Sequence, residues 1–170
     1  ILKSPYPHAR VKNIDTSKIT DPTVFTLTPD EVPDVTFCPR LVSVPSSTYK
    51  DWKVLTDKPR YVGEPVVAVA AESEAEAQAA IEAISVEYER LSAVYDVFHS
   101  MKPETEPIHS DIMLADDWIK IENNIACSLD ITEGDPEEGF KEADYIVEDT
   151  YRTNRRYHTQ METKSVLARP

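Results

Sequence analysis

The chain of 170 residues contains little glycine and no long apolar run. Its three glycines, Gly63, Gly134 and Gly139, are too few and too scattered for a phosphate-binding loop. Such a loop needs several glycines, so that backbone N–H groups can close around the anion. No apolar run approaches the roughly 20 residues of a membrane-spanning helix, and the N-terminus does not resemble a signal peptide. We therefore expect a soluble protein without a nucleotide loop.

Cysteine is also scarce. Cys38 and Cys127 are the only two, far apart in the sequence and in no CxxC pair. Two cysteines form at most one disulfide, and nothing in their spacing requires an oxidising compartment. A reduced, cytoplasmic setting is the simplest expectation.

Basic residues are outnumbered, with 18 against 31 acidic residues and a net charge of −13. This balance disfavours nucleic acid as a partner, because binding would rest on phosphate contacts. Between Thr150 and Pro170 the balance reverses, with one acid, Glu162, against five basic residues: Arg152, Arg155, Arg156, Lys164 and Arg169. This end of the chain could dock a phosphate-bearing cofactor. The alternative, which we favour, is that these residues face outward from a strand or contact further chain.

Residues that carry chemistry show no diagnostic spacing. The histidines His8, His99, His109 and His158 form no HxxxH or HExxH pair, and no cysteine lies near a histidine at zinc-finger spacing. No GxSxG-type nucleophile turn is present. Adjacent acids, such as Asp116 with Asp117 and Glu137 with Glu138, are usually solvated in so acidic a chain.

The stretch "HTQMET" is the most interesting polar cluster, because His158 and Glu162 lie four residues apart beside basic residues. In a strand, positions four apart share a face without being adjacent, so a structural role is favoured. We assign no catalytic, cofactor-binding or metal-binding residue in this chain.

The N-terminal part predicts short strands and turns. A strand is expected around Val11, and "TVFTL" is a second β-rich run. In "TPDEV", Thr28 is expected to cap a one-turn helix that begins at Pro29. Residues 35–58 have no clear period and are predicted to be loop.

The clearest pattern lies between Arg60 and Leu91. "PVVAVAA", Pro65 to Ala71, predicts a strand buried on both faces. Ser73 and Glu76 then form a capping box for a helix with one apolar stripe: Ala77, Ala80, Ile81 and Ile84. "SVEYERL" alternates as a half-buried strand. These three elements predict a βαβ-like unit, provided that the two strands are parallel.

The C-terminal part predicts a connector and a second ordered block. Residues 92–129 have no period, and "HSMKPETEPIHSD" is typical of an exposed connector. Asp135 and Pro136 are expected to begin a short helix in which Phe140 and Ala143 pack. "YIVEDTYRT" and "KSVLA" are predicted strands. The whole is an α+β fold, a mixed sheet with one main helix packed on it, followed by a short helix and strands.

Five stretches, in this order, resemble the molybdenum-binding large subunit of the xanthine dehydrogenase and aldehyde oxidase family. They are "SPYPHARVKNIDTSK", "RYVGEPVVAVAAES", "SVEYERL", "EGDPEEGFKEADYIVEDTYRT" and "HTQMET". The chain departs from the family where "DPTVFTL" replaces the common Pro-Gly-Val, and where glycines are missing around "TPDEVPD". These departures leave the substrate class open.

The resemblance implies an α/β hammerhead domain over residues 1–98, a linker over 99–129 and the beginning of a molybdopterin-binding domain over 130–170. It implies a segment of a larger cytoplasmic enzyme that hydroxylates heteroaromatic rings or aldehydes with oxygen from water. The family's glycine-rich cofactor loop and catalytic glutamate are expected after residue 170, so this segment is expected to be non-catalytic and to bind no cofactor itself. The parent enzyme is expected to use the molybdopterin cofactor, with iron–sulfur clusters and usually FAD on other domains or subunits.

The expected partners are the remainder of the large subunit and the iron–sulfur and flavin subunits or domains. Nucleic acid and membrane are not expected as partners, and a homodimer is left open. The alternative hypothesis is a free-standing interaction or ligand-binding module that uses the hammerhead fold.

Overall fold

The computed structural model describes residues 1–38, 49–109, 113–114, 124–125, 131–162 and 166. The chain divides into two compact units, residues 1–129 and residues 130–170. None of the helices in the described ranges is both long and apolar enough to cross a membrane.

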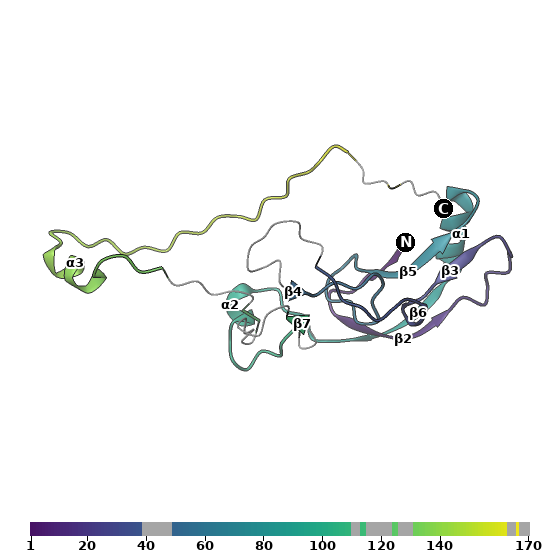
Figure 1. Cartoon of the computed structure of the whole chain (residues 1–170), viewed down its shortest axis with the longest axis horizontal. Coiled ribbons are helices and arrows are strands. Elements are labelled where there is room, and N and C mark those ends of the chain that lie inside the picture. Colours follow the sequence, from purple (N-terminus) through teal and green to yellow (C-terminus); the bar gives the residue numbers. More distant parts are fainter. Residues whose placement is uncertain (39–48, 110–112, 115–123, 126–130, 163–165, 167–170) are drawn as a thin grey trace. The chain divides into compact units, whose positions relative to one another are not determined.

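The first unit contains a three-stranded antiparallel sheet in the order β1 (Leu2–Lys3), β5 (Pro65–Ala70) and β3 (Phe25–Leu27) (Figure 1). The central strand is the predicted apolar run. Its consecutive residues Val66 and Val67 are both 0% exposed, and consecutive strand residues point to opposite faces. The prediction of a strand buried on both faces is therefore confirmed.

Helix α1 (Glu74–Ala83) follows β5 and packs on it. The hydroxyl of Ser73 accepts the N–H of Glu76 over 3.3 Å, and the carboxylate of Glu76 accepts the N–H of Ser73 over 3.0 Å. This reciprocal pair is the predicted capping box. Ala80 is buried and the other three residues of the predicted stripe are half-buried, so the orientation of the helix is confirmed.

A second sheet pairs β2 (Ala9–Asp15) with β6 (Ser85–Arg90) in antiparallel register, with Val11 opposite Tyr88 (Figure 1). Because β5 and β6 belong to different sheets, the condition for a βαβ-like unit is not met. Strand β6 pairs instead with the N-terminal strand β2. The α+β class is confirmed, but the pairs between described strands are all antiparallel rather than mixed.

Residues 35–58, predicted as loop, include a short ordered ribbon. Phe37 and Trp52 form an antiparallel bridge, and β4 (Tyr49–Lys50) pairs with β7 (Met113–Leu114). The preceding turn is η1 (Pro29–Glu31), a 3-10 helix that begins where "TPDEV" predicted it.

The segment predicted as an exposed connector belongs to the first unit, and its described residues are partly folded. It begins with α2 (Val97–Ser100), and the buried Thr105 donates its hydroxyl to the carbonyl oxygen of His99 over 2.6 Å. The side chain of Asn124 donates to the carbonyl oxygens of Ser100 and Glu106 and accepts the N–H of Ile108. These bonds close a compact loop within the predicted connector, although most of its described residues between 99 and 109 are exposed.

The second unit contains α3 (Pro136–Glu142), and the carboxylate of Asp135 caps it by accepting the N–H of Glu138. The cap is confirmed, but the predicted packing is wrong, because Phe140 is 62% exposed and Ala143 is exposed. The described residues 145–153 form no strand, since no described segment pairs with them. "KSVLA" lies outside the described residues except for Val166.

Candidate functional site

The turn at Gly63 joins two stretches that are far apart in the sequence. Its N–H donates to the carbonyl oxygen of Ser4 over 2.8 Å, and the N–H of Ser4 donates to the carbonyl oxygen of Glu64 over 2.9 Å. Gly63 has a φ of +96°, a left-handed conformation in which glycine avoids the strain of a side chain. The "SPYPHA" and "RYVGEP" stretches therefore meet in one backbone joint.

His8 and Ala9 extend this joint to the end of β6. The N–H of Ala9 donates to the carbonyl oxygen of Pro59, and the N–H of Leu91 donates to that of His8, both over 3.0 Å. The Nδ1 atom of His8 lies 2.6 Å from the carbonyl oxygen of Ser92. Because a carbonyl only accepts, Nδ1 carries the proton of this bond. The ring of His8 is thus a buried clamp between β2 and the chain after β6.

An aromatic contact connects the same region to the "SVEYERL" stretch. The rings of Tyr6 and Tyr88 meet edge to face with centroids 5.3 Å apart. The guanidinium of Arg90 lies 4.3 Å from the Tyr6 ring centre, and its Nη2 donates to the Tyr6 hydroxyl over 3.1 Å. The stretch "SPYPHARVKNIDTSK" therefore contacts both "RYVGEPVVAVAAES" and "SVEYERL" through backbone bonds and packing.

Glu64 is the carboxyl group of this joint whose pKa is raised. Burial raises its pKa, while the N–H of Arg60, which donates to it, and the charge of Arg60 oppose the rise. A raised carboxyl pKa is one feature of general acids. Here, however, the carboxylate accepts the N–H of a residue in its own turn, so its evident role is to close that turn.

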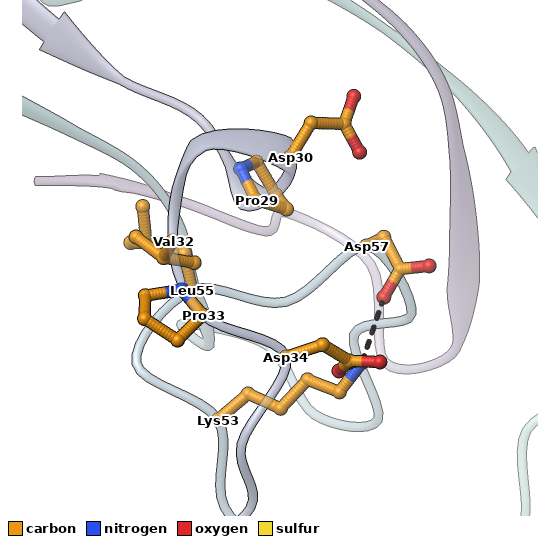
Figure 2. A pocket seen from close by; sticks show the side chains of 8 residues that line it. All are labelled: Pro29, Asp30, Val32, Pro33, Asp34, Lys53, Leu55 and Asp57. Carbon is orange, nitrogen blue, oxygen red and sulfur yellow. Dashed lines mark ion pairs between the residues drawn. The ribbon is translucent and has the colours of Figure 1, made fainter.

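A separate hollow of about 270 Å³ lies beside η1, and Figure 2 shows the residues that line it. Among these described lining residues, Lys53 is the only basic one; its Nζ lies 2.9 Å from Oδ1 of Asp34 and 3.6 Å from Oδ1 of Asp57. The hydrogen bond to Asp34 is the main reason that the pKa of Lys53 is raised, against the opposing effect of burial. The third carboxylate in the wall is that of Asp30. With three carboxylates and one ammonium, the hollow has an excess of negative charge.

The described residues offer no metal centre: no group of three or more His, Cys, Asp or Glu side chains among them could hold a metal ion. The four histidines lie in different parts of the structure and do not form a common site among the described residues. His8 bonds the chain after β6, His99 lies within α2, His109 lies in the folded connector loop, and His158 is exposed in the second unit. Asp116 and Asp117 lie outside the described residues, and Glu137 and Glu138 are exposed in the first turn of α3.

Comparison with known proteins assigns the first unit. The family model "Aldehyde oxidase and xanthine dehydrogenase, a/b hammerhead domain" matches residues 1–92, which is more than half of the chain. The chain belongs to the aldehyde oxidase and xanthine dehydrogenase family. A second model, "Molybdopterin cofactor-binding domain", matches residues 119–170. The resemblance seen in the five sequence stretches is therefore confirmed.

Relatives in this family are subunits of molybdenum oxidoreductases. The chain is 34% identical to a probable xanthine dehydrogenase subunit of Bacillus subtilis, covering 100% of this chain and 21% of that protein. It is 29% identical to the nicotinate dehydrogenase large molybdopterin subunit of Eubacterium barkeri, covering 95% of this chain and 35% of that subunit. The chain thus spans only a fragment of these relatives.

Solved structures confirm the hammerhead-type fold. The aldehyde oxidoreductase from Desulfovibrio gigas is 30% identical with a TM-score of 0.52, over 65% of this chain and 13% of that chain. The enzyme from Desulfovibrio desulfuricans is 29% identical with a TM-score of 0.54, again over 65% of this chain and 13% of that one.

The described residues of the second unit do not fit the molybdopterin cofactor by themselves. Residues 131–162 are all exposed, so none of them places a buried hydrogen-bond donor where it could bind the cofactor. A phosphate at the start of α3 would be repelled by the carboxylates of Glu137 and Glu138. The basic residues Arg152, Arg155 and Arg156 and the pair His158 and Glu162 are exposed without converging on a site. Lys164 and Arg169 lie outside the described residues. A cofactor site in this domain would therefore need further residues.

Sequence reasoning missed the hollow around Lys53. Three of its lining residues, Lys53, Leu55 and Asp57, come from the stretch assigned to loop, and the others come from residues 29–34 at and after the predicted one-turn helix. One local signal was available, since Lys53 and Asp57 lie four residues apart and form an ion pair. The pairing with Asp34 is a contact across the ribbon, which no local spacing indicates.

Proposed function

We propose that this chain is the scaffold segment of the molybdopterin-binding subunit of a molybdenum hydroxylase. In this proposal residues 1–98 are the hammerhead domain, residues 99–129 are the linker and residues 130–170 begin the cofactor-binding domain. The parent enzyme hydroxylates heteroaromatic rings or aldehydes with oxygen taken from water. The segment shapes the subunit and its interfaces, and supplies no catalytic residue.

One observation carries the proposal. The residues that resemble the family most closely in the first unit, around Ser4, Gly63 and Tyr88, make strand joints and ring packing instead of lining an open site. Residues that hold strands together set the shape of a domain. The exposed apolar side chains of the second unit, such as Phe140 and Tyr145, fit the same proposal, because a larger domain would cover them.

The cofactor and the partners belong to the parent enzyme in this proposal. Molybdopterin, when bound by further residues of the subunit, supplies the redox chemistry, and iron–sulfur clusters and usually FAD on other domains or subunits carry the electrons away. The partners are those further residues and the redox subunits, in the cytoplasm.

The test measures molybdenum content and turnover separately in the full protein with its associated subunits. A variant of the joint, Tyr6→Ala, is expected to lower the yield of folded enzyme and the molybdenum bound per subunit. The rate per bound molybdenum is expected to stay within about twofold of the parent, because a scaffold residue does not touch the reacting atoms. A large fall in rate per molybdenum without loss of stability would contradict the scaffold role.

Isotopically labelled water tests the reaction class. Hydroxylation of a panel of heteroaromatic compounds and aldehydes is expected to place oxygen from water in the product. Transfer of oxygen from molecular oxygen, or absence of molybdenum from the purified full protein, would overturn the proposed activity. A folded, monomeric, metal-free protein that binds a ligand would favour the alternative, a free-standing binding module.

A further inference from the structure

Strand β6 has a described neighbour along only one of its two edges, where it pairs with β2 (Figure 1). The N–H of Leu91, just after β6, donates to the carbonyl oxygen of His8 on the β2 side. Alternate residues of a strand direct their backbone groups to the same edge, so Glu89 and Glu87 also face β2. The residues whose N–H and C=O groups lie at the opposite edge are Val86, Tyr88 and Arg90. In the part of the chain that the structure describes, no backbone segment bonds to these groups.

Strand β2, by contrast, has partners along both edges. The N–H of Ala9 donates to the carbonyl oxygen of Pro59, and that of Val11 donates to the carbonyl oxygen of Asp57 over 2.7 Å. Both donors alternate with Arg10, which is paired with β6. The side of β2 away from β6 is therefore covered by the segment 57–59, whereas the corresponding side of β6 is open among the described residues.

An open strand edge pairs readily with a further extended segment, because its N–H and C=O groups match those of another strand. We define the β6 edge as the outward backbone groups of Val86, Tyr88 and Arg90. The six residues of β6 make this edge about 20 Å long, which is enough for one complete partner strand.

Glu87 is the charged side chain at the middle of this edge that has no described partner. The Nζ atom of Lys12 lies 3.0 Å from Oε2 of Glu89, but no described residue forms an ion pair or hydrogen bond with the carboxylate of Glu87. In an added antiparallel strand, the residue opposite Glu87 would occupy a non-hydrogen-bonded pair, in which side chains approach most closely. Opposite charges at such a pair are stabilising. The β6 edge therefore fits a segment with Lys or Arg opposite Glu87 and an apolar side chain beside the half-buried ring of Tyr88.

The same glutamates disfavour a second copy of β6 as the added strand. Antiparallel pairing of Tyr88 with Tyr88 of the copy would place Glu87 opposite Glu89 twice. Sliding one strand by two residues in either direction would place Glu87 opposite Glu87, or Glu89 opposite Glu89. Like charges directly opposite each other are destabilising, so each of these registers is opposed.

The size of the edge favours a segment of the same polypeptide over a separate chain. One strand edge is a small contact compared with the roughly 1,000 Å² that a stable complex between separate chains buries. A tethered segment needs less, because the tether raises its effective concentration. The relatives extend far beyond the region that they share with this chain, which spans 21% of the Bacillus subtilis protein.

We propose that the β6 edge takes up an extended segment of the same subunit from outside residues 1–170, with Lys or Arg opposite Glu87 and an apolar side chain beside Tyr88. This inference rests on the proposed function, because it requires the larger subunit.

Amide hydrogen exchange in the full protein with its associated subunits tests whether the edge is occupied. We expect the N–H of Tyr88 to exchange within about tenfold of the rate of the Glu89 N–H, which faces β2. Charged residues also keep strand edges unpaired. If Glu87 serves only in that way, the Tyr88 N–H will exchange more than about tenfold faster than that of Glu89, and the inference is overturned.

A photo-crosslinking amino acid, p-benzoylphenylalanine, identifies the occupant when it replaces Ser85, an exposed residue on the same face of β6 as Glu87. The matched control places it at Glu72, which is exposed and outside the strands. We expect position 85 to link to the same polypeptide outside residues 1–170 in at least about fivefold higher yield than position 72. Links only to another subunit, only to a second copy or only within residues 1–170, or equal yields at both positions, would each overturn the inference.

Two substitutions at Glu87 test the charge of the occupant. Glu87→Lys is expected to lower the crosslinking yield at position 85 about fivefold and Glu87→Gln to lower it less, because a basic residue opposite would repel the lysine. Glu72→Lys makes the same charge change away from the edge and should leave the yield unchanged. Equal effects of the two lysine variants would overturn the proposed charge, and the melting temperature of each variant checks that it is folded.

Molybdenum in the parent protein separates the two proposals. An open β6 edge in a protein that contains molybdenum would overturn this inference alone. Absence of molybdenum from the full protein would overturn the proposed function.

Discussion

Ser4 and Glu64 are sixty residues apart in the sequence, yet the N–H of Ser4 donates to the carbonyl oxygen of Glu64 over 2.9 Å. The returning bond comes from Gly63, whose N–H donates to the carbonyl oxygen of Ser4. This two-way pairing fixes the N-terminal strand against the turn that begins β5. The geometry of that turn is therefore a determinant of stability for the whole first unit.

Replacing the glycine of this turn tests its backbone geometry. Gly63→Ala is expected to lower the free energy of unfolding by about 1–3 kcal/mol, because alanine strains at a φ of +96°. No atom of the described residues lies within 4 Å of the added Cβ, so the cost comes from the backbone and not from a clash. Urea unfolding measures it.

Gly139→Ala is the matched control for that variant. Its added Cβ also meets no described atom within 4 Å, but it lies within helix α3, where alanine is favoured over glycine by about 1 kcal/mol. It is expected to leave the first unit unchanged and to raise the helix content. Equal destabilisation by both variants would contradict the assigned role of the turn.

The protonation of Glu64 predicts a pH dependence of stability. Burial raises its pKa in the folded protein above the ordinary value of 4.5, so the folded state binds the proton more tightly than the unfolded state. The stability from this group is present below that ordinary value and is lost as the pH rises through the folded pKa. Glu64→Gln is therefore expected to gain stability relative to the parent as the pH rises above that ordinary value.

Glu89→Gln supplies a control of opposite sign. The hydrogen bond from Lys12, 3.0 Å away, lowers the pKa of Glu89, so its contribution is present at neutral pH and is lost as the pH falls through the folded pKa. This variant should lose stability relative to the parent at neutral pH and match it in acid. Urea unfolding at several pH values measures the stability of both variants relative to the parent. If that relative stability changes with pH in the same direction in both variants, the pKa of Glu64 is not raised by burial.

The capping box of α1 predicts a graded response at one position. Ser73→Ala is expected to cost about 1 kcal/mol of unfolding free energy, because the N–H of Glu76 loses its acceptor. Ser73→Asp, which keeps an acceptor at the cap, should recover most of that loss. Circular dichroism during urea unfolding measures both. If the aspartate variant is as unstable as the alanine variant, the hydrogen bond at the cap does not contribute to the stability of α1.

The side chain of Asn124 holds the connector loop through three hydrogen bonds, and its loss is expected to be costly. Asn124→Ala leaves the N–H of Ile108 and the carbonyl oxygens of Ser100 and Glu106 without their partner. We expect a loss of about 1–3 kcal/mol and faster amide exchange at Ile108. Asn154→Ala, at an exposed position, is the matched control and should change neither quantity. Unchanged amide exchange at Ile108 in Asn124→Ala would show that the side chain of Asn124 does not hold the connector loop.

Local patterns predicted the local elements well. The capped start of α1, the Pro29 turn, the apolar strand β5 and the alternation of β6 each depend on residues within about four positions, so their signals are complete in the sequence. The five family-like stretches were readable for the same reason, since each is a short run of residue types in a fixed order.

The sequence by itself therefore determined where the main helix and strands begin, and to which family the chain belongs. Only the tertiary structure decided that β6 pairs with β2 instead of β5, that Thr105 is buried within a supposed connector, and that Phe37 and Trp52 share an outward face. The physical reason is that pairing and burial depend on contacts between distant segments. The free energy of strand pairing and of burial depends on which surfaces come into contact. The periodicity of one segment does not show which other segment will pack against it.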